Sequence, residues 1–383
     1  MDIDRAKDVA GRLHWADTAK GLIILIIVLS HGALFVEGAG YAQAWLRNAI
    51  GIFTPVGMPL FFLISGMFSR RHLDGGWGAL WHGRLRAILW VLLIWVPIDW
   101  MLFALFPNFH DTAHGKYWWQ LITAFILPSS YLWFIWSLGA YAILGKVLGR
   151  GSPWLWASLA AGVAMAMLGM TTWHLDRYGF HLLASDYYLR GALSYFFYFY
   201  AGYAFKPRIV RASRLPPLPA FVVSAVAFIM LALLARLATG VIGGGILRFV
   251  AVATGIYGAI FLGEVLASWS GTRRLFGSLG RMTLPIYLTH LLVMVPLAWW
   301  LGTLNSPLLH QAGVLTPIIV SIISLAGSVA ITALAPRTAL KLLFVPPTFR
   351  RPPDARRGIG WPAAMPSHGA RDPGNNPRSN QTG

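Results

Sequence analysis

The chain alternates between long apolar runs and short polar stretches. Runs of about 17 to 25 apolar residues can cross a bilayer as helices. We predict ten such runs, at residues 19–36, 50–68, 86–106, 131–149, 153–171, 189–206, 216–239, 245–268, 281–302 and 313–336. The pattern therefore predicts an all-α integral membrane protein, a bundle of about ten transmembrane helices.

Composition supports this class. Of the 383 residues, 57% are hydrophobic and only 11% are charged, whereas globular domains carry about 25% charged residues. The 18 tryptophans and 22 phenylalanines add an apolar load that no soluble surface could hide. The absence of cysteine excludes disulfides, thiolate metal sites and a cysteine nucleophile.

The basic residues predict the orientation of the chain. The net charge is +18, but Lys and Arg fall in short clusters between apolar runs, which argues against a nucleic-acid partner. With the N-terminus in the cytoplasm, 25 of the 31 basic residues lie on the cytoplasmic side of ten helices. This is the positive-inside pattern, so we expect both termini to lie in the cytoplasm. We expect the chain to span a bacterial-type inner membrane, with the lipid bilayer as a partner.

Three parts follow from these boundaries: a cytoplasmic N-terminal segment at 1–18, a transmembrane domain at 19–345, and a disordered cytoplasmic tail at 346–383, which is rich in Pro, Arg, Gly and Asn. Ala42-Gln43-Ala44 resembles a signal-peptide cleavage site. However, the apolar run before it exceeds the usual length of about 7–15 residues and contains a histidine. We therefore expect the first span to be retained.

The first predicted span carries ionisable residues on one stripe. Lys20 and His31 are eleven residues apart, so on a helix they differ by about 20° in direction and lie about 16 Å apart. Asp17, three residues before Lys20, is close enough to pair with it. Such groups are costly in lipid and must face protein or water, which indicates function. The simpler alternative is two interface charges and a packing histidine.

The residues around this stripe resemble those of a known family. Trp15-Ala16-Asp17-Thr18-Ala19-Lys20-Gly21, followed by an aliphatic run into Ser30-His31, resembles the opening of the membrane-bound acyltransferase-3 family. That family has a basic residue, ten residues and then histidine in its first transmembrane helix. Lysine in place of the commoner arginine is similar to the sugar O-acetyltransferase branch related to fucose 4-O-acetylase.

Further segments match in order along about 340 residues. Pro59 to Phe68 resembles the family's FF-x-x-SG segment, and Leu132-Trp133-Phe134 resembles its tryptophan-phenylalanine element. Leu279 to His290 resembles its late G-x-x-[ST]-L-x-x-Y-x-x-H segment. The resemblance implies an O-acyltransferase, most simply an O-acetyltransferase. It would use acetyl-CoA or another acyl-CoA as donor substrate, without a bound cofactor or metal, and would act on an extracytoplasmic or lipid-linked glycan.

The predicted chemistry assigns roles to individual residues. A histidine titrates nearest neutral pH, so His31 can act as a general base or as a nucleophile, and both routes stay open. Asp99, beside a proline, could orient His31 or be an interface carboxylate, and His290 could bind the acceptor or tune His31. We therefore take His31, Asp99 and His290 as the candidate catalytic residues.

Two more groups would bind substrates. The expected acyl-donor residues are Lys20, Asp17, Arg84, Arg86 and Arg281, although the positive-inside bias alone could explain each arginine. The expected acceptor residues are Trp133, Tyr287, Trp173, Arg177 and His181. An ordinary aromatic belt at the membrane interface is the alternative for the aromatic members.

A different class of function remains open, a transporter or flippase of a glycan or lipid with His31 and Asp99 as a proton relay. Transporters commonly have glycine-interrupted helices in matched halves. The one strong interruption here, Gly243-Gly244-Gly245, is expected in a loop. A purely structural scaffold has no use for an aligned stripe of ionisable residues.

Overall fold

The computed structural model describes residues 13–347 except 42–43, 107–114, 129, 150, 171, 178, 180–182, 184–186, 239 and 305. The described residues all belong to one compact unit. The predicted disordered tail lies almost wholly outside the described residues. Within the described part of the chain every regular element is helical.

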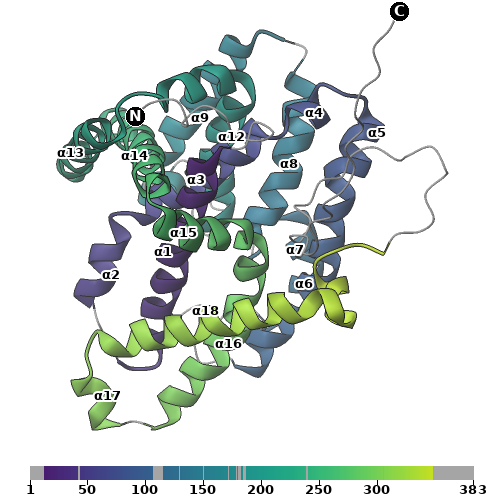
Figure 1. Ribbon diagram of the computed structural model, residues 1–383, viewed down its shortest axis with the longest axis vertical. Coiled ribbons are helices and arrows are strands. Elements are labelled where there is room, and N and C mark those ends of the chain that lie inside the picture. Colours follow the sequence, from purple (N-terminus) through teal and green to yellow (C-terminus); the bar gives the residue numbers. More distant parts are fainter. Residues whose placement is uncertain are drawn as a thin grey trace, which may run out of the picture. The chain divides into compact units, whose positions relative to one another are not determined.

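Ten helices of 14 residues or more make up most of the described chain, and Figure 1 shows their arrangement. These are α1 (His14–Gly38), α3 (Thr54–Met67), α6 (Arg86–Leu105), α8 (Trp133–Leu148), α9 (Pro153–Gly169), α12 (Tyr187–Ala212), α13 (Pro217–Leu237), α14 (Val241–Ser268), α16 (Thr283–Leu304) and α18 (Leu315–Leu334). The shorter elements are α2 (Ala44–Gly51), α4 (Arg70–Leu73), α5 (Trp77–Leu80), η1 (Trp81–Leu85), α7 (Gln120–Ile126), α10 (Thr172–Arg177), α15 (Ser270–Arg281), α17 (Pro307–Gln311), η2 (Ala335–Arg337) and η3 (Ala339–Leu343).

Seven helical segments of the described chain are long and apolar enough to cross a membrane, and α8 and α9 are shorter apolar helices. Helix α13 shows how these segments meet their surroundings. Only 11% of its most apolar 18-residue window is buried, and Val223, Met230 and Leu237 on it are exposed. An outward apolar surface of this kind fits lipid, so the protein is an integral membrane protein.

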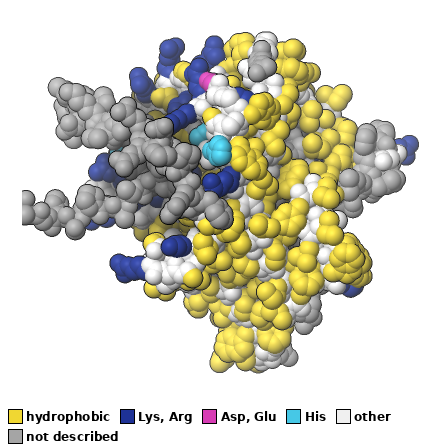
Figure 2. Space-filling model, turned by 90° about the vertical axis from the view of Figure 1, so that its right-hand side faces the viewer, with side chains coloured by type: hydrophobic (Ala, Val, Ile, Leu, Met, Phe, Trp, Pro, Cys, Tyr) yellow, Lys and Arg dark blue, Asp and Glu magenta, His cyan; other side chains and the backbone are white. Residues whose placement is uncertain are grey.

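The surface view agrees with this reading. Hydrophobic side chains cover most of the described surface on the face drawn in Figure 2. Lys and Arg side chains gather mainly in the upper left part of the same face. The separation of apolar and basic surface is typical of a protein that contacts both lipid and water.

Helix α1 begins at His14, so it contains the whole predicted span and also holds Asp17 in its first turn. The prediction of a loop at the glycine run is wrong. Gly243-Gly244-Gly245 is not a loop, because α14 begins at Val241. A Cβ on Gly245 would collide with the backbone carbonyl of Met165 in α9, so this glycine serves close helix packing.

Close glycine contacts also join α3 to α12. A Cβ on Gly66 would collide with the carbonyl of Phe199, and a Cβ on Gly202 would collide with the carbonyl of Leu63. Small residues let helix backbones approach closely. In lipid the hydrophobic effect does not drive helices together, so this close van der Waals packing is what holds them. The Ser-Gly pair of the predicted second span therefore serves packing through its glycine.

Helix α1 lies at the centre of the packing that positions the site. It contacts α3, α14, α15, α16 and α18. Gly21 of α1 meets the carbonyl of Phe276, and Gly280 meets the carbonyl of Asp17, so α15 lies directly against the first turns of α1. Because α16 follows α15 in sequence, it continues along the part of α1 that carries His31 (Figure 1).

Candidate active site

Two histidines from opposite ends of the chain meet between α1 and α16. His31 Nδ1 lies 2.8 Å from His290 Nε2, and the two rings are nearly parallel with centroids 5.1 Å apart. His290 is 1% exposed, and Ser324 of α18 donates a hydrogen bond to its carbonyl. The pair is thus held by three helices.

The partners of His290 define which nitrogen of each ring carries a hydrogen. His290 Nδ1 lies 3.0 Å from the carbonyl oxygen of Ile286 and 2.8 Å from that of Tyr287. Carbonyl oxygens only accept, so we assign the hydrogen of the neutral His290 ring to Nδ1. His290 Nε2 is then an acceptor, and His31 Nδ1 must donate to it. This leaves the lone pair of His31 on Nε2, the nitrogen that can take a proton.

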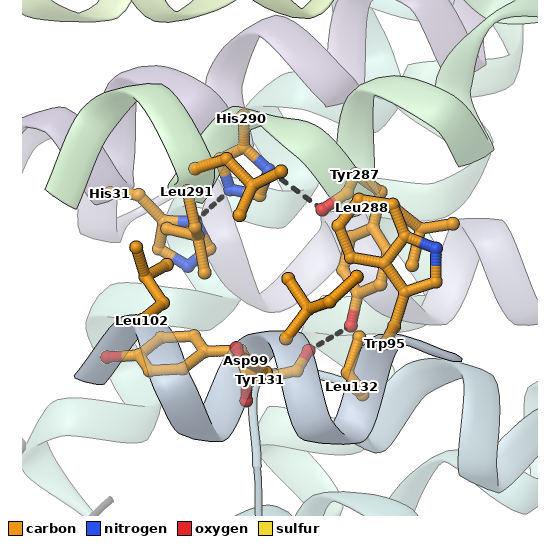
Figure 3. A pocket seen from close by; sticks show the side chains of 12 residues that line it. His31, Trp95, Asp99, Leu102, Tyr131, Leu132, Tyr287, Leu288, His290 and Leu291 are labelled. Atoms are coloured by element: carbon orange, nitrogen blue, oxygen red, sulfur yellow. Dashed lines mark hydrogen bonds between the residues drawn. The ribbon is translucent and has the colours of Figure 1, made fainter. Parts of the chain in front are cut away.

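A small cavity opens beside the histidine pair (Figure 3). It measures about 20 Å³ and is lined by side chains from α1, α6 and α16 and from the segment before α8: His31, Trp95, Ile98, Asp99, Leu102, Tyr131, Leu132, Tyr287, Leu288, His290, Leu291 and Leu292. This volume holds about one water molecule. Any molecule larger than water can therefore enter only if side chains around the cavity move.

Two polar side chains, Asp99 and Tyr287, share the cavity with the histidines. Asp99 of α6 is 9% exposed and Tyr287 of α16 lies one turn before His290. The hydroxyl of Tyr287 donates to the carbonyl of Tyr131, which fixes the segment that enters α8 (Figure 3). The structure thus brings together the three predicted catalytic residues and one predicted acceptor residue. The hydrogen-bond partner of His31 Nδ1 is His290 and not Asp99.

Tyr131 is a cavity residue that the sequence did not single out. Its ring packs edge-on against His31 at 5.8 Å and stacks on Phe103 at 5.2 Å. It directly precedes the Leu132-Trp133-Phe134 element, and that adjacency was the available signal. Trp133 itself points into an aromatic cluster with Phe62 and Tyr195 rather than into the cavity.

The segment after α18 packs against Trp95, one of the residues that line the cavity. Trp95 lines the cavity and donates from Nε1 to the carbonyl of Leu343, 2.7 Å away. Phe344 packs on the same indole at 6.1 Å. Arg86 donates to the carbonyl of Pro347 at 2.7 Å, so this predicted donor-binding residue instead holds the end of the strap that 339–347 forms over α6.

Arg84 also has protein partners in place of a predicted phosphate. It lies in the π-helical turn η1 and donates to the hydroxyls of Ser65 and Ser69. Its guanidinium lies 5.6 Å from the ring centre of Phe199. Burial lowers the pKa of nearby His72 below 6.5, and the positive charge of Arg84 lowers it further. Arg84 therefore clamps η1 to α3.

Lys20, Asp17 and Arg281 lie together near the start of α1. Lys20 Nζ lies 3.0 Å from Asp17 Oδ1, as the three-residue spacing predicts. Asp17 and Arg281 line a second pocket, of about 210 Å³, which neither Arg84 nor Arg86 lines. The first helix thus connects a charged pocket at its beginning with the histidine cavity farther along.

The remaining predicted acceptor residues belong to the segment between α9 and α12. Arg177 is exposed at the end of α10. His181 and the side chain of Trp173 lie outside the described residues. The structure does not bring Arg177 to the histidine cavity.

The acyltransferase-domain model of the acyltransferase-3 family matches residues 13–333. The chain is 23% identical over 157 residues to "Inner membrane protein YcfT" of Escherichia coli, covering 36% of this chain and 44% of that protein. It is 29% identical over 174 residues to "Nodulation protein NolL" of Mesorhizobium japonicum, covering 42% of this chain and 43% of that protein.

These alignments span less than half the length of either relative. No solved structure matches the chain. The family match, by contrast, extends from the beginning of α1 to the last turn of α18 and so includes both histidines. The chain therefore belongs to the acyltransferase-3 family.

Proposed function

We propose that this protein is an O-acyltransferase that moves an acetyl group from cytoplasmic acetyl-CoA to a hydroxyl of an extracytoplasmic or lipid-linked glycan. The observation that carries the proposal is the contact between His31 Nδ1 and His290 Nε2, 2.8 Å apart. With the assigned hydrogens, it leaves a basic nitrogen on His31 and keeps that ring in one orientation.

His31 is the general base in this mechanism. Its Nε2 takes the proton of the acceptor hydroxyl while the hydroxyl oxygen bonds to the acyl carbon. The bond between the acyl carbon and sulfur then breaks, and His31 returns the proton to the leaving thiolate. The hydrogen bond from Nδ1 to His290 remains throughout and stabilises the imidazolium form, and the nearby Asp99 carboxylate lining the same cavity favours that positive charge.

The geometry of α1 supports a cytoplasmic donor. Lys20 lies eleven residues before His31 on a continuous helix, which places it about 16 Å away along the axis. An extended acyl-CoA can hold its phosphates at one end of this distance and its thioester at the other. Lys20, Asp17 and Arg281 are the proposed donor residues, and Tyr287, Trp133, Trp173, Arg177 and His181 remain the proposed acceptor residues.

The proposed membrane arrangement has ten spans and both termini in the cytoplasm. Seven long apolar segments, the shorter α8 and α9, and α12 correspond in order to the ten runs predicted from the sequence. The proposed domain extends over 19–345, with 1–18 and the tail 346–383 in the cytoplasm. An inner membrane is supported by the name of the relative from Escherichia coli.

The test is the acyl content of the surface glycan in cells that produce His31→Ala in place of the wild type. We expect acylation to be lost, while the variant accumulates normally in the membrane and unmodified glycan still reaches the surface. Normal acylation at normal protein level would refute the role of His31. Loss of the glycan from the surface would instead favour the transporter.

A further inference from the structure

A second pocket lies at the beginning of α1, beside the amphipathic helix α15. We infer that it binds the phosphate groups of the acyl-CoA donor, with Arg273, Arg274 and Arg281 as its ligands. The inference rests on the proposed function, because it assigns a binding site for the donor of that reaction.

The three arginines share one face of α15. Ser270, Arg273, Arg274, Gly277 and Arg281 all line the pocket, and their spacing of three, four, seven and eleven residues from Ser270 is that of one helix face. The positive-inside bias alone would not require the arginines to share one face of the helix. The arginines instead converge on a single concave site.

Gly277 lies on the same face of α15 and forms the floor of the pocket. A Cβ placed there would meet only Arg281 Nη1, at 3.7 Å, so the guanidinium of Arg281 folds back over the glycine. The absence of a side chain at this position keeps the pocket open between Arg281 and the turn that carries Arg273 and Arg274. The pocket thus has guanidinium groups at its sides and bare backbone at its floor.

The residues on the opposite wall of the pocket do not neutralise the charge of the three arginines. The wall formed by α1 contributes His14, Asp17 and Thr18. The carboxylate of Asp17 is already paired with Lys20 at 3.0 Å. In the described part of the chain, the guanidinium groups of Arg273, Arg274 and Arg281 make no hydrogen bond or ion pair. The pocket therefore keeps a positive charge that a phosphate would neutralise.

Helix ends add to this charge. His14 is the first residue of the 25-residue helix α1, so the pocket borders the end at which backbone N–H groups carry partial positive charge. Anions bind favourably at such ends. The combination of guanidinium groups and a helix N-terminus selects a phosphate over a neutral ligand.

Size and position indicate which part of the donor occupies the pocket. About 210 Å³ is less than the 300 to 1,000 Å³ of pockets that enclose a whole ligand of drug size, so the site holds one end of a longer molecule. His14 lies 17 residues before His31 on α1, or about 25 Å along the axis. In coenzyme A the 3′-phosphate lies farther from the thioester than the pyrophosphate does, so the 3′-phosphate suits this pocket and the pyrophosphate suits Lys20, about 16 Å from His31.

Coenzyme A binding by the purified full-length protein in nanodiscs of neutral lipid tests the inference. We expect the combined variant Arg273→Gln, Arg274→Gln, Arg281→Gln to raise the Kd by roughly tenfold or more, since it removes the charge-assisted hydrogen bonds of all three guanidinium groups. Dephospho-coenzyme A, which lacks the 3′-phosphate, should bind the wild type more weakly than coenzyme A and should lose less in the variant. The matched controls are Arg211→Gln, in α12, and Arg214→Gln, just after α12. Both arginines are exposed, and both variants should leave the Kd unchanged.

Gly277→Leu provides a second test that keeps all three charges. It fills the floor of the pocket and should also weaken binding of coenzyme A, while thermal unfolding in each variant confirms that the protein remains folded. An unchanged Kd in both the combined variant and Gly277→Leu would overturn the inference.

The same experiment distinguishes the two sources of phosphate. Repeated in nanodiscs that contain phosphatidylglycerol, coenzyme A binding by the wild type should persist if the pocket serves the donor. If the variant binds coenzyme A like the wild type but loses an affinity for phosphatidylglycerol, the pocket holds a lipid headgroup and the inference is wrong. If the wild type binds no coenzyme A at all, the proposed donor fails together with the site, whereas equal binding by wild type and variant removes the site alone.

Discussion

His31 and His290 lie 259 positions apart in the sequence, yet their ring nitrogens are 2.8 Å apart. The contact joins α1 to α16, and Ser324 of α18 donates a hydrogen bond to the carbonyl oxygen of His290. Because the Nδ1 of His290 faces two carbonyl oxygens, the direction of the hydrogen bond between the rings follows from the fold. We therefore expect His290 to act as a positioning residue for His31.

The role of His290 predicts a difference between two substitutions. His290→Leu removes the acceptor for His31 Nδ1 and should lower kcat by roughly 10- to 100-fold, the range seen for residues that orient a functional histidine. His290→Gln offers an amide oxygen as acceptor and should restore much of the loss. The KM for acetyl-CoA should stay unchanged in both variants, which steady-state kinetics on purified protein can measure. A His290→Gln variant no more active than His290→Leu would contradict the positioning role.

Arg84 should contribute to folding rather than to donor binding. Its hydrogen bonds to Ser65 and Ser69 use the fork of the guanidinium, which a lysine cannot reproduce. Arg84→Lys should therefore lower the thermal-unfolding midpoint, and Ser65→Ala should lower it less once Arg84 is already changed. The double-mutant cycle measures this coupling. Arg71→Lys, at an exposed arginine in α4, is the control and should unfold like the wild type.

The lowered pKa of His72 predicts a dependence of stability on pH. Burial is the main cause, and the positive charge of Arg84 adds to it, so the folded state holds the proton less tightly than the unfolded state. The free energy of unfolding should therefore decrease as the pH falls from about 7 to about 5, through the ordinary pKa of histidine. In His72→Gln this part of the decrease should disappear. An identical pH dependence of unfolding in the two proteins would show that His72 does not contribute.

The glycine contacts predict where a single methyl group is not tolerated. Gly66→Ala places a Cβ against the carbonyl of Phe199, and Gly280→Ala places one against the carbonyl of Asp17. Each should reduce the free energy of unfolding by about 1–3 kcal/mol, the usual cost of overpacking. Gly162→Ala is the matched control, because nothing lies within 4 Å of a Cβ there and it also stands within a helix. Equal stability of Gly66→Ala and Gly162→Ala would contradict the packing assigned to α3 and α12.

The sequence predicted the elements of this fold well because lipid imposes a simple rule on them. Long apolar runs must be helical to satisfy their backbone groups, and the positions of the ten long helices follow from that rule. The wrong interpretation of Gly243-Gly244-Gly245 has a physical reason. In water this run would favour a loop, but a membrane helix uses the same glycines to approach its neighbour, as Gly245 does at α9.

The candidate site was predictable where its residues share a helix or stand in a segment that resembles the family, as Tyr287 and His290 do. Helix geometry connects Asp17, Lys20 and His31, and the ion pair between Asp17 and Lys20 has the predicted spacing. The contacts of Arg84 and Arg86 depend on tertiary packing, which spacing along the chain cannot supply. The same limit applies to Arg273 and Arg274, whose pocket exists only because α15 packs against the start of α1.

The most direct test of the account is the rate of acetyl transfer from radiolabelled acetyl-CoA to the glycan fraction in isolated membranes that contain the acceptor. His31→Ala should lower this rate by about 10²- to 10⁴-fold, the usual contribution of a general base, and coenzyme A should bind the purified variant as it binds the wild type. Transfer by His31→Ala at the wild-type rate and protein level would contradict the assignment of His31 as the base.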